Sequence, residues 1–205
     1  MQPAADSPLE HLVLPLLAQG LPAMPPATLD PLLDAASTCL AANGLSRTRV
    51  ADIARELGVV PSTVYRKVGS VEGAAWLLCA REAHRFLSGM PQVIAGVEGA
   101  RMVTVFLGAG IQAALDHPVF AKVVRDEPDF VGRAVTRRLP AIIEQGATAA
   151  APFLQVAMDI GLIRRQDPQW LAAWMARLTV ATLLAPPAGD LQDELDAVLL
   201  PLLAP

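Results

Sequence analysis

Residues 61–68 (PSTVYRKV) bring hydroxyl groups and positive charge together within one short stretch. At α-helical spacing one face of this stretch is apolar, with Val64 and Val68, and the other is polar. The polar face carries Ser62, Thr63, Arg66 and Lys67. Hydroxyl, guanidinium and ammonium groups donate hydrogen bonds to phosphates and base edges, and arginine can bind O6 and N7 of guanine together. These residues therefore predict recognition of nucleic acid, with Tyr65 either bonding a phosphate or packing its ring.

The charge around this stretch contrasts with that of the whole chain, whose 205 residues carry a net charge of −4. Residues 44–69 have five basic side chains against two acidic ones, a net charge of +3: Arg47, Arg49, Arg55, Arg66 and Lys67 against Asp52 and Glu56. Positive charge concentrated in one small segment is typical of phosphate binding. A solvated charged face is the alternative, and the helical pattern favours nucleic-acid binding over it.

Two very short helices with a turn between them are predicted at about residues 49–67. The first has an apolar stripe of Val50, Ile53, Ala54 and Leu57. Gly58 ends this helix, and Pro61 suits the first position of the second. The layout predicts a helix-turn-helix. Thr48 and Arg49 open the first helix, where backbone N–H groups and a hydroxyl form a natural phosphate site.

Residues 28–78 resemble the DNA-binding domain of the tetracycline-repressor (TetR) family. The resemblance rests on three groups in register: Val50-x-x-Ile53-Ala54-x-x-x-Gly58-Val59, then Ser62-Thr63-Val64-Tyr65, then Gly69-Ser70-x-Glu72. It implies DNA contacts at Thr48, Arg49, Pro61, Ser62, Thr63, Tyr65, Arg66 and Lys67. It also implies a homodimeric, ligand-responsive transcriptional repressor that binds double-stranded operator DNA. The apolar side chains of the C-terminal region lead us to expect that a small apolar effector releases it from the operator.

Three valines depart from the family's pattern. Val60 stands where a serine usually caps the recognition helix, Val68 where a phenylalanine is usual, and Val71 where a lysine usually lies near the phosphates. A lost cap costs about 1 kcal/mol, and a lost lysine removes one phosphate contact. These departures leave open an alternative, a TetR-like protein with weak or no operator binding that acts through protein contacts.

The predicted fold class is all-α, with an N-terminal helix-turn-helix domain and a C-terminal helical domain. The sequence divides into a proline-rich arm over residues 1–27, the helix-turn-helix domain over 28–75, and a ligand-binding and dimerisation domain over 76–205. A helix from Ser70 to about Ser88 joins the two domains. Further helices are predicted at about 96–116, 118–126, 129–138, 140–160, 168–185 and 189–203.

The predicted helices at about 168–185 and 189–203 are candidates for a homodimer interface. The first is apolar almost all round, so it needs burial on two sides. The second carries one apolar stripe, and together they suit a four-helix interface between two copies. A wholly intramolecular core is the alternative.

Large apolar side chains of the C-terminal region are candidates for an effector pocket. They are Phe86, Met90, Met102, Phe106, Phe153 and Met158. Any one of them taken alone is more often a core residue than a pocket residue. An apolar cavity lined by such residues would suit a small apolar ligand.

The sequence contains no pattern that predicts an enzyme, a metal site or a cofactor. Cys39 and Cys79 are too few and too far apart for a disulfide framework or a metal site. We find no nucleophile with a nearby base, no H-x-x-x-H and no phosphate loop. No run reaches the roughly 18 apolar residues of a membrane span, and the first apolar stretch lacks the basic start of a secretory signal. We therefore expect a cytoplasmic protein that does not enter a membrane.

Overall fold

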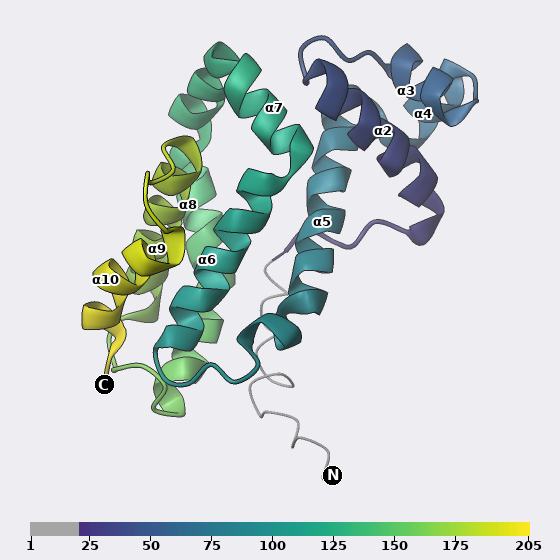
Figure 1. The fold of residues 1–205 in the computed structure, drawn as a ribbon. Helices are drawn as coiled ribbons and strands as arrows, with labels where there is room; N and C mark the ends of the chain where they lie inside the picture. Colours follow the sequence, from purple (N-terminus) through teal and green to yellow (C-terminus); the bar gives the residue numbers. More distant parts are fainter. Residues whose placement is uncertain (1–20) are drawn as a thin grey trace. The chain divides into compact units, whose positions relative to one another are not determined.

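The structure is a computed structural model that describes residues 21–205, apart from the side chain of Ala134. Every regular element within this range is a helix, which confirms the predicted all-α class (Figure 1). The elements are η1 (Ala27–Leu29), α2 (Asp30–Asn43), α3 (Val50–Leu57), α4 (Pro61–Val68), α5 (Val71–Ile94), α6 (Arg101–Asp116), α7 (Pro118–Asp126), α8 (Pro128–Asp159), α9 (Pro168–Leu184) and α10 (Leu191–Leu203). Most of the arm predicted for residues 1–27 lies outside the described residues.

Two compact units divide the described chain. The N-terminal unit consists of residues 22–85 and 114–137, and the C-terminal unit of residues 86–113 and 138–205. Helices α5 and α8 contribute residues to both units. The two units are defined by contacts and do not divide at residue 75. The boundary expected there, between a DNA-binding and a ligand-binding domain, stays a prediction.

The N-terminal unit has one apolar core shared by α2, α3, α4 and the beginning of α5. Its most deeply buried large side chains are Leu32, Leu33, Leu40, Ile53, Val64 and Leu78. Burying one such side chain stabilises the fold by about 1.5–3 kcal/mol. Arg81 adds a polar connection from α5 to α2, with Nη1 2.8 Å from Asp34 and 3.2 Å from Asp30. Val119 of α7 packs against the same core.

In the C-terminal unit, a partly buried polar cluster connects α6 with α10. The carboxylate of Asp196 accepts hydrogen bonds from Arg101 Nε at 2.9 Å, from Gln192 Nε2 at 2.8 Å and from the hydroxyl of Thr104. Thr104 is fully buried. Apolar side chains complete the core of this unit, among them Met90, Val103, Ile111, Leu154, Leu171 and Leu203.

The helix break predicted at Pro140 is wrong, because α8 continues through both Pro140 and Pro152. A proline inside a helix leaves the carbonyl four residues earlier without its usual donor. Both prolines are exposed, so water can hydrate those carbonyls. The helix predicted from residue 96 begins later, at Arg101, because Gly96 and Gly99 adopt positive φ angles of 75° and 61°.

No single helix within residues 21–205 is both long and apolar enough to cross a membrane. Helices α6 and α7 meet the length and composition requirement only as a pair, and they are bent by 68° at the break between them. His117 lies in that break in an extended conformation, as expected for a residue before a proline.

Candidate nucleic-acid interface

Helices α3 and α4 form the predicted helix-turn-helix. Gly58 ends α3 in a left-handed conformation, with φ 73° and ψ 31°, which a glycine adopts without steric cost. Pro61 occupies the first turn of α4. Ile53 and Val64 are both fully buried, so the two helices share their inner faces with the core of the N-terminal unit. The outer face of α4 is left to solvent.

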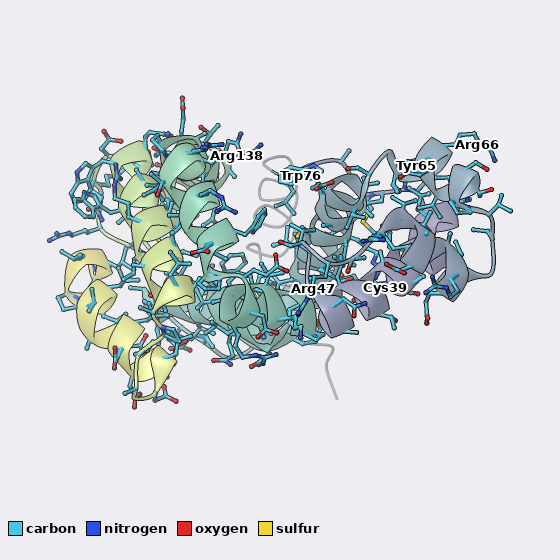
Figure 2. All side chains as sticks on the ribbon, turned by 90° about the horizontal axis from the view of Figure 1, so that it is seen from above. Cys39, Arg47, Tyr65, Arg66, Trp76 and Arg138 are labelled. Atoms are coloured by element: carbon cyan, nitrogen blue, oxygen red, sulfur yellow. The ribbon has the colours of Figure 1, made fainter. Side chains whose placement is uncertain are left out.

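The outer face of α4 carries the side chains that the sequence singles out for nucleic-acid contact. Pro61, Ser62, Arg66 and Lys67 are exposed, and Thr63 is half-buried. The side chain of Tyr65 is 57% exposed, so its ring does not pack into the core. Figure 2 shows Tyr65 and Arg66 projecting from the helix. This face therefore offers hydroxyl, guanidinium and ammonium donors together.

The first turn of α3 is held by a carboxylate. Asp52 accepts a hydrogen bond from the backbone N–H of Arg49 at 2.9 Å, and it also forms an ion pair with Arg55 at 3.2 Å. The side chain of Arg49 is exposed. Because Asp52 binds the N–H of Arg49, that donor is engaged within the protein, and the guanidinium is the part of Arg49 free to reach a phosphate.

Thr48 is placed differently from the other predicted contact residues. It is 5% exposed, and its hydroxyl donates to the carbonyl of Gly44 at 2.6 Å, with the carbonyl of Cys39 3.3 Å away. Its side chain therefore faces the protein, which corrects the expectation of a phosphate contact through the hydroxyl. The residue fixes the chain between α2 and α3.

The three valines that depart from the family's pattern have distinct environments. Val60 precedes α4 without any side-chain cap and is 63% exposed. Val71 is buried in the core of the N-terminal unit, and Val68 is half-buried against that core. A lysine at position 71 would have to extend out of this core, so the local packing suits valine there.

The predicted effector residues lie in the C-terminal unit, where three aromatic rings meet. The rings of Phe86 and Phe106 are 5.8 Å apart between centroids at 68°, and those of Phe106 and Phe153 are 5.8 Å apart at 32°. Met90 and Met158 are buried, and Met102 is half-buried. A Cβ on Gly110 would lie 3.3 Å from the ring of Phe86, so this ring occupies the space beside the glycine.

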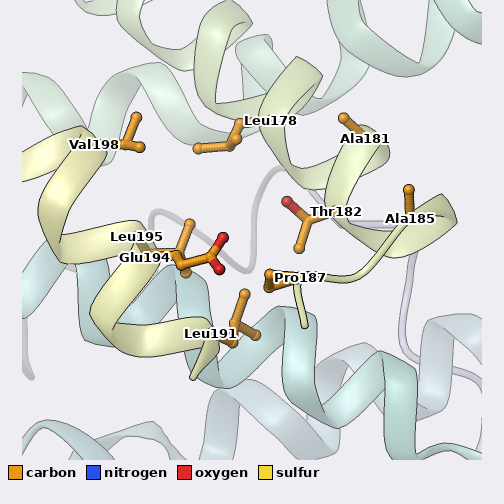
Figure 3. Close-up of a pocket in the computed structure, with 9 residues that line it drawn as sticks. All are labelled: Leu178, Ala181, Thr182, Ala185, Pro187, Leu191, Glu194, Leu195 and Val198. Carbon is orange, nitrogen blue, oxygen red and sulfur yellow. The ribbon is translucent and has the colours of Figure 1, made fainter. Parts of the chain in front are cut away.

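A separate groove of about 270 Å³ lies between α9 and α10 and was not anticipated as a cavity (Figure 3). Its lining residues are Leu178, Ala181, Thr182, Ala185, Pro187, Leu191, Glu194, Leu195 and Val198. Trp170 and Trp174, 51% and 55% exposed, lie earlier on α9. The apolar residues on all sides of α9 predicted that this helix needs a second partner. That pattern does not distinguish a groove from a flat face.

The described residues contain no group of three or more His, Cys, Asp or Glu side chains that could hold a metal ion. The thiol of Cys39 is buried, and burial raises its pKa, with Glu56 and Asp52 acting in the same direction. Such a thiol is a poor nucleophile at neutral pH. The candidate sites among the described residues are the face of α4, the ring cluster and the groove.

A sequence profile for bacterial regulatory proteins of the tetR family matches residues 32–70, which include all of α3 and α4. Solved structures share the fold. The TetR-family repressor AlkX from Dietzia sp. strain DQ12-45-1b, implicated in biodegradation of n-alkanes, is 18% identical, with 86% of this chain and 95% of that chain covered and a TM-score of 0.59. The TetR-family transcriptional repressor QsdR from R. erythropolis is 22% identical, with 85% and 95% covered and a TM-score of 0.56.

The fatty acid degradation regulator FadR from Bacillus halodurans is 17% identical, with 86% of this chain and 94% of that chain covered and a TM-score of 0.54. No curated protein matches the chain at the level of sequence. The profile covers the helix-turn-helix described above, and the fold is shared along most of the chain. The helix-turn-helix of this protein thus matches the model of the tetR family of bacterial regulatory proteins, and most of the chain shares the fold of solved TetR-family regulators.

Proposed function

We propose that this regulator is a homodimeric repressor that binds operator DNA through α4 and is released by a small apolar effector. The observation that carries the proposal is the outer face of α4. Ser62, Arg66 and Lys67 on this face are exposed, and none of them makes a side-chain hydrogen bond or ion pair with another part of residues 21–205. Because these donors are unused within the chain, they are available to phosphates and base edges. Because its target is operator DNA, we assign the protein to the cytoplasm.

The DNA contacts that we propose are Arg49, Pro61, Ser62, Thr63, Tyr65, Arg66 and Lys67. Arg66 is the candidate for base recognition, because arginine can bind guanine through two hydrogen bonds. Lys67 and Tyr65 are candidates for phosphate contacts. Thr48 keeps a positioning role, since its hydroxyl is bound to the carbonyl of Gly44.

The proposed dimer uses α9 and α10 of each copy. Exposed apolar side chains on these helices support this choice: Trp170, Trp174, Leu184, Val198 and Leu202. Two copies related by a two-fold axis would each present the same surface, so the surface must be complementary to itself. Four helices packed in this way would bury side chains that a single chain leaves in water.

The distribution of large and small residues along α9 supports an antiparallel register. Trp174 lies four residues before Leu178, and the small groove residues Ala181 and Thr182 lie three and four residues after it. A two-fold axis near Leu178 would therefore bring Trp174 of one copy to the groove of the other. Arg177, which lies over the Trp174 ring, would approach Glu194 at the groove wall.

The proposed effector site is the ring cluster of Phe86, Phe106 and Phe153. These rings, with Met90, Met102 and Met158, supply apolar side chains between which an apolar ligand could insert, because methionine side chains repack readily. Phe86 belongs to α5, the helix whose first residue, Val71, lies in the core of the helix-turn-helix. A ligand that separates the rings would release DNA only if it favours the DNA-free conformation.

The experiment is selection of duplexes from a random pool by the full-length protein, followed by footprinting. The proposal predicts a roughly palindromic site whose half-sites are about 34–36 Å apart, the spacing of adjacent major grooves on one side of DNA. A single asymmetric half-site would contradict the dimer. Failure to enrich any duplex would favour the alternative of a protein-binding TetR relative, which the uncapped start of α4 at Val60 supports.

A further inference from the structure

We infer that Glu127, at the corner between α7 and α8, is a positioning residue for DNA binding because it holds the loop that precedes α3. Its carboxylate accepts hydrogen bonds from the backbone N–H of Ser46, 3.2 Å from Oε1 and 3.1 Å from Oε2, and from the hydroxyl of Ser46. Ser46 is 81 residues earlier in the chain and lies between α2 and α3. Three contacts thus connect one carboxylate to one loop residue.

The corner that carries Glu127 is itself fixed. The N–H of Glu127 donates to the carbonyl of Val123 at 2.9 Å, and its carbonyl accepts from the N–H of Val131 at 3.0 Å. Neighbouring cations bind Asp126 instead, with Lys122 Nζ at 2.7 Å and Arg125 Nε at 2.9 Å. The backbone of Glu127 is therefore anchored to both helices, and its side chain is left to the loop.

The loop is shaped to receive this carboxylate. Gly44 is buried and has a φ of 79°, and a Cβ at this position would overlap Oε1 of Glu127. The backbone conformation favours a glycine here, and the carboxylate of Glu127 occupies the space where a Cβ would lie. The sequence indicates only that the Asn-Gly pair ends a helix, so this second feature of Gly44 is visible only in the structure.

Fixing this loop fixes where α3 begins. The carbonyl of Gly44 accepts the hydroxyl of Thr48 at 2.6 Å, and Arg49 begins the turn that Asp52 holds. Ser46 lies between these two fixed points. Without Glu127 the loop would sample more conformations, and α3 and α4, which move with it, would be presented to DNA less uniformly. An ordered loop lowers the entropic cost of binding.

The sign of the change in DNA affinity when Glu127 loses its charge distinguishes a positioning role from a purely electrostatic one. Removing a negative charge from a DNA-binding protein strengthens its attraction to phosphates. Positioning predicts the reverse for Glu127→Gln, because the neutral amide has one acceptor oxygen in place of two and loses the charge-assisted hydrogen bonds from Ser46. Glu144→Gln, at an exposed position on α8, removes the same charge without touching the loop and is the matched control.

The test rests on the proposed DNA contacts of α4 and uses full-length protein with a duplex selected by the wild type. We expect Glu127→Gln to weaken binding of this duplex roughly tenfold, the change that corresponds to one hydrogen bond, and Glu144→Gln to leave it unchanged or slightly tighter. Amide exchange at residues 44–49 of the free protein should become faster in Glu127→Gln only. Ser46→Ala should weaken binding less, and adding it to Glu127→Ala should cost nothing further.

Three results would overturn the inference: unchanged affinity in Glu127→Gln, equal loss in Glu144→Gln, or additive losses in the double variant. Arg66→Ala separates this failure from failure of the proposed function. If Arg66→Ala weakens binding and Glu127→Gln does not, the α4 contacts stand and the role of Glu127 is wrong. If Arg66→Ala has no effect while Glu127→Gln weakens binding, the α4 contacts are wrong and Glu127 positions another surface.

Discussion

Trp170 and Trp174 meet edge to face on the exposed side of α9, with ring centroids 6.4 Å apart and planes at 64°. The guanidinium of Arg177 lies 5.3 Å from the centroid of Trp174. Tryptophan and arginine are enriched among residues that dominate binding at protein interfaces. These two indoles and the guanidinium are exposed in the single chain, and the proposed dimer would cover them.

The first prediction concerns this interface. Trp174→Ala should weaken dimerisation by about 30-fold or more, the effect of losing a central interface residue, measured by analytical ultracentrifugation. Ala181→Trp should also weaken it by overfilling the groove, and the double variant should recover part of the loss, because the exchange conserves total volume. Trp76→Ala, at a similarly exposed tryptophan of the N-terminal unit, is the control. A Trp174→Ala protein that dimerises like the wild type would contradict the interface.

The second prediction distinguishes the two faces of α4. Arg66→Ala should weaken binding of a selected duplex by roughly 5- to 150-fold, equivalent to about 1–3 kcal/mol, with little change in Tm. Val64→Asp should unfold the N-terminal unit, because it buries an unpaired charge in a fully enclosed site. Circular dichroism melts and a binding titration measure both. Equal losses of Tm in the two variants would show that the faces are assigned wrongly.

The third prediction uses the missing cap of α4. Val60→Ser should raise the free energy of unfolding by about 1 kcal/mol, because its hydroxyl can accept a backbone N–H of the first turn. Val60→Ala, which shortens the same side chain without adding an acceptor, is the control and should give no comparable gain. Urea titrations monitored by circular dichroism provide the comparison. No difference between the two variants would mean that water already hydrogen-bonds the free backbone N–H groups in the first turn of α4.

The fourth prediction is a pH dependence of stability from Asp196. Burial alone would raise the pKa of this carboxyl, but hydrogen bonds from Thr104, Arg101 and Gln192 outweigh it, so the pKa is lowered. The stabilisation is therefore complete above the ordinary carboxyl pKa of about 4 and is lost as pH falls through the lowered value.

Urea unfolding between roughly pH 7 and pH 3 tests this sign, in the range where carboxyl groups titrate. The wild type should lose stability on acidification more steeply than Asp196→Asn, which has no proton to take up. Asp193→Asn, at an exposed position on the same helix, should behave like the wild type. Parallel curves for wild type and Asp196→Asn would rule out this linkage.

The fifth prediction follows from the reciprocity of coupled binding. If an apolar compound found by thermal-shift screening lowers operator affinity by a given factor, operator DNA must lower affinity for that compound by the same factor, ordinarily about 5- to 150-fold. Calorimetry with and without a saturating duplex measures the second factor. Identical affinities in the two titrations would exclude release of DNA by that compound.

The helix-turn-helix was predictable because local signals agree there. Gly58, Pro61 and the apolar positions Ile53 and Val64 each specify the same turn and the same buried face. The limits of α9 and α10 lie within two residues of those predicted, and Asp167 and Asp190 cap their first turns. In each case the residue determines the conformation of a segment only a few positions away in the sequence.

The sequence failed where a distant neighbour or water decides the outcome. Pro140 looks like a helix break, but exposure lets α8 continue through it. Thr48 looks like a phosphate ligand, but its hydroxyl bonds to Gly44. The contact of Glu127 with Ser46 spans 81 residues and has no local pattern. The groove beside Thr182 and Glu194 depends on how α9 and α10 pack, which their separate patterns do not specify.

The salt dependence of DNA binding tests the central claim, that the outer face of α4 binds DNA. Each phosphate contact contributes a slope of about −0.9 to the logarithm of affinity against the logarithm of salt concentration. For a selected duplex we predict a steep decrease for the wild type between about 50 and 200 mM salt, a slope shallower by about 1 in Lys67→Ala, and an unchanged slope in Arg138→Ala, an exposed arginine outside α4. A Lys67→Ala slope equal to that of the wild type, or affinity independent of salt, would contradict the account.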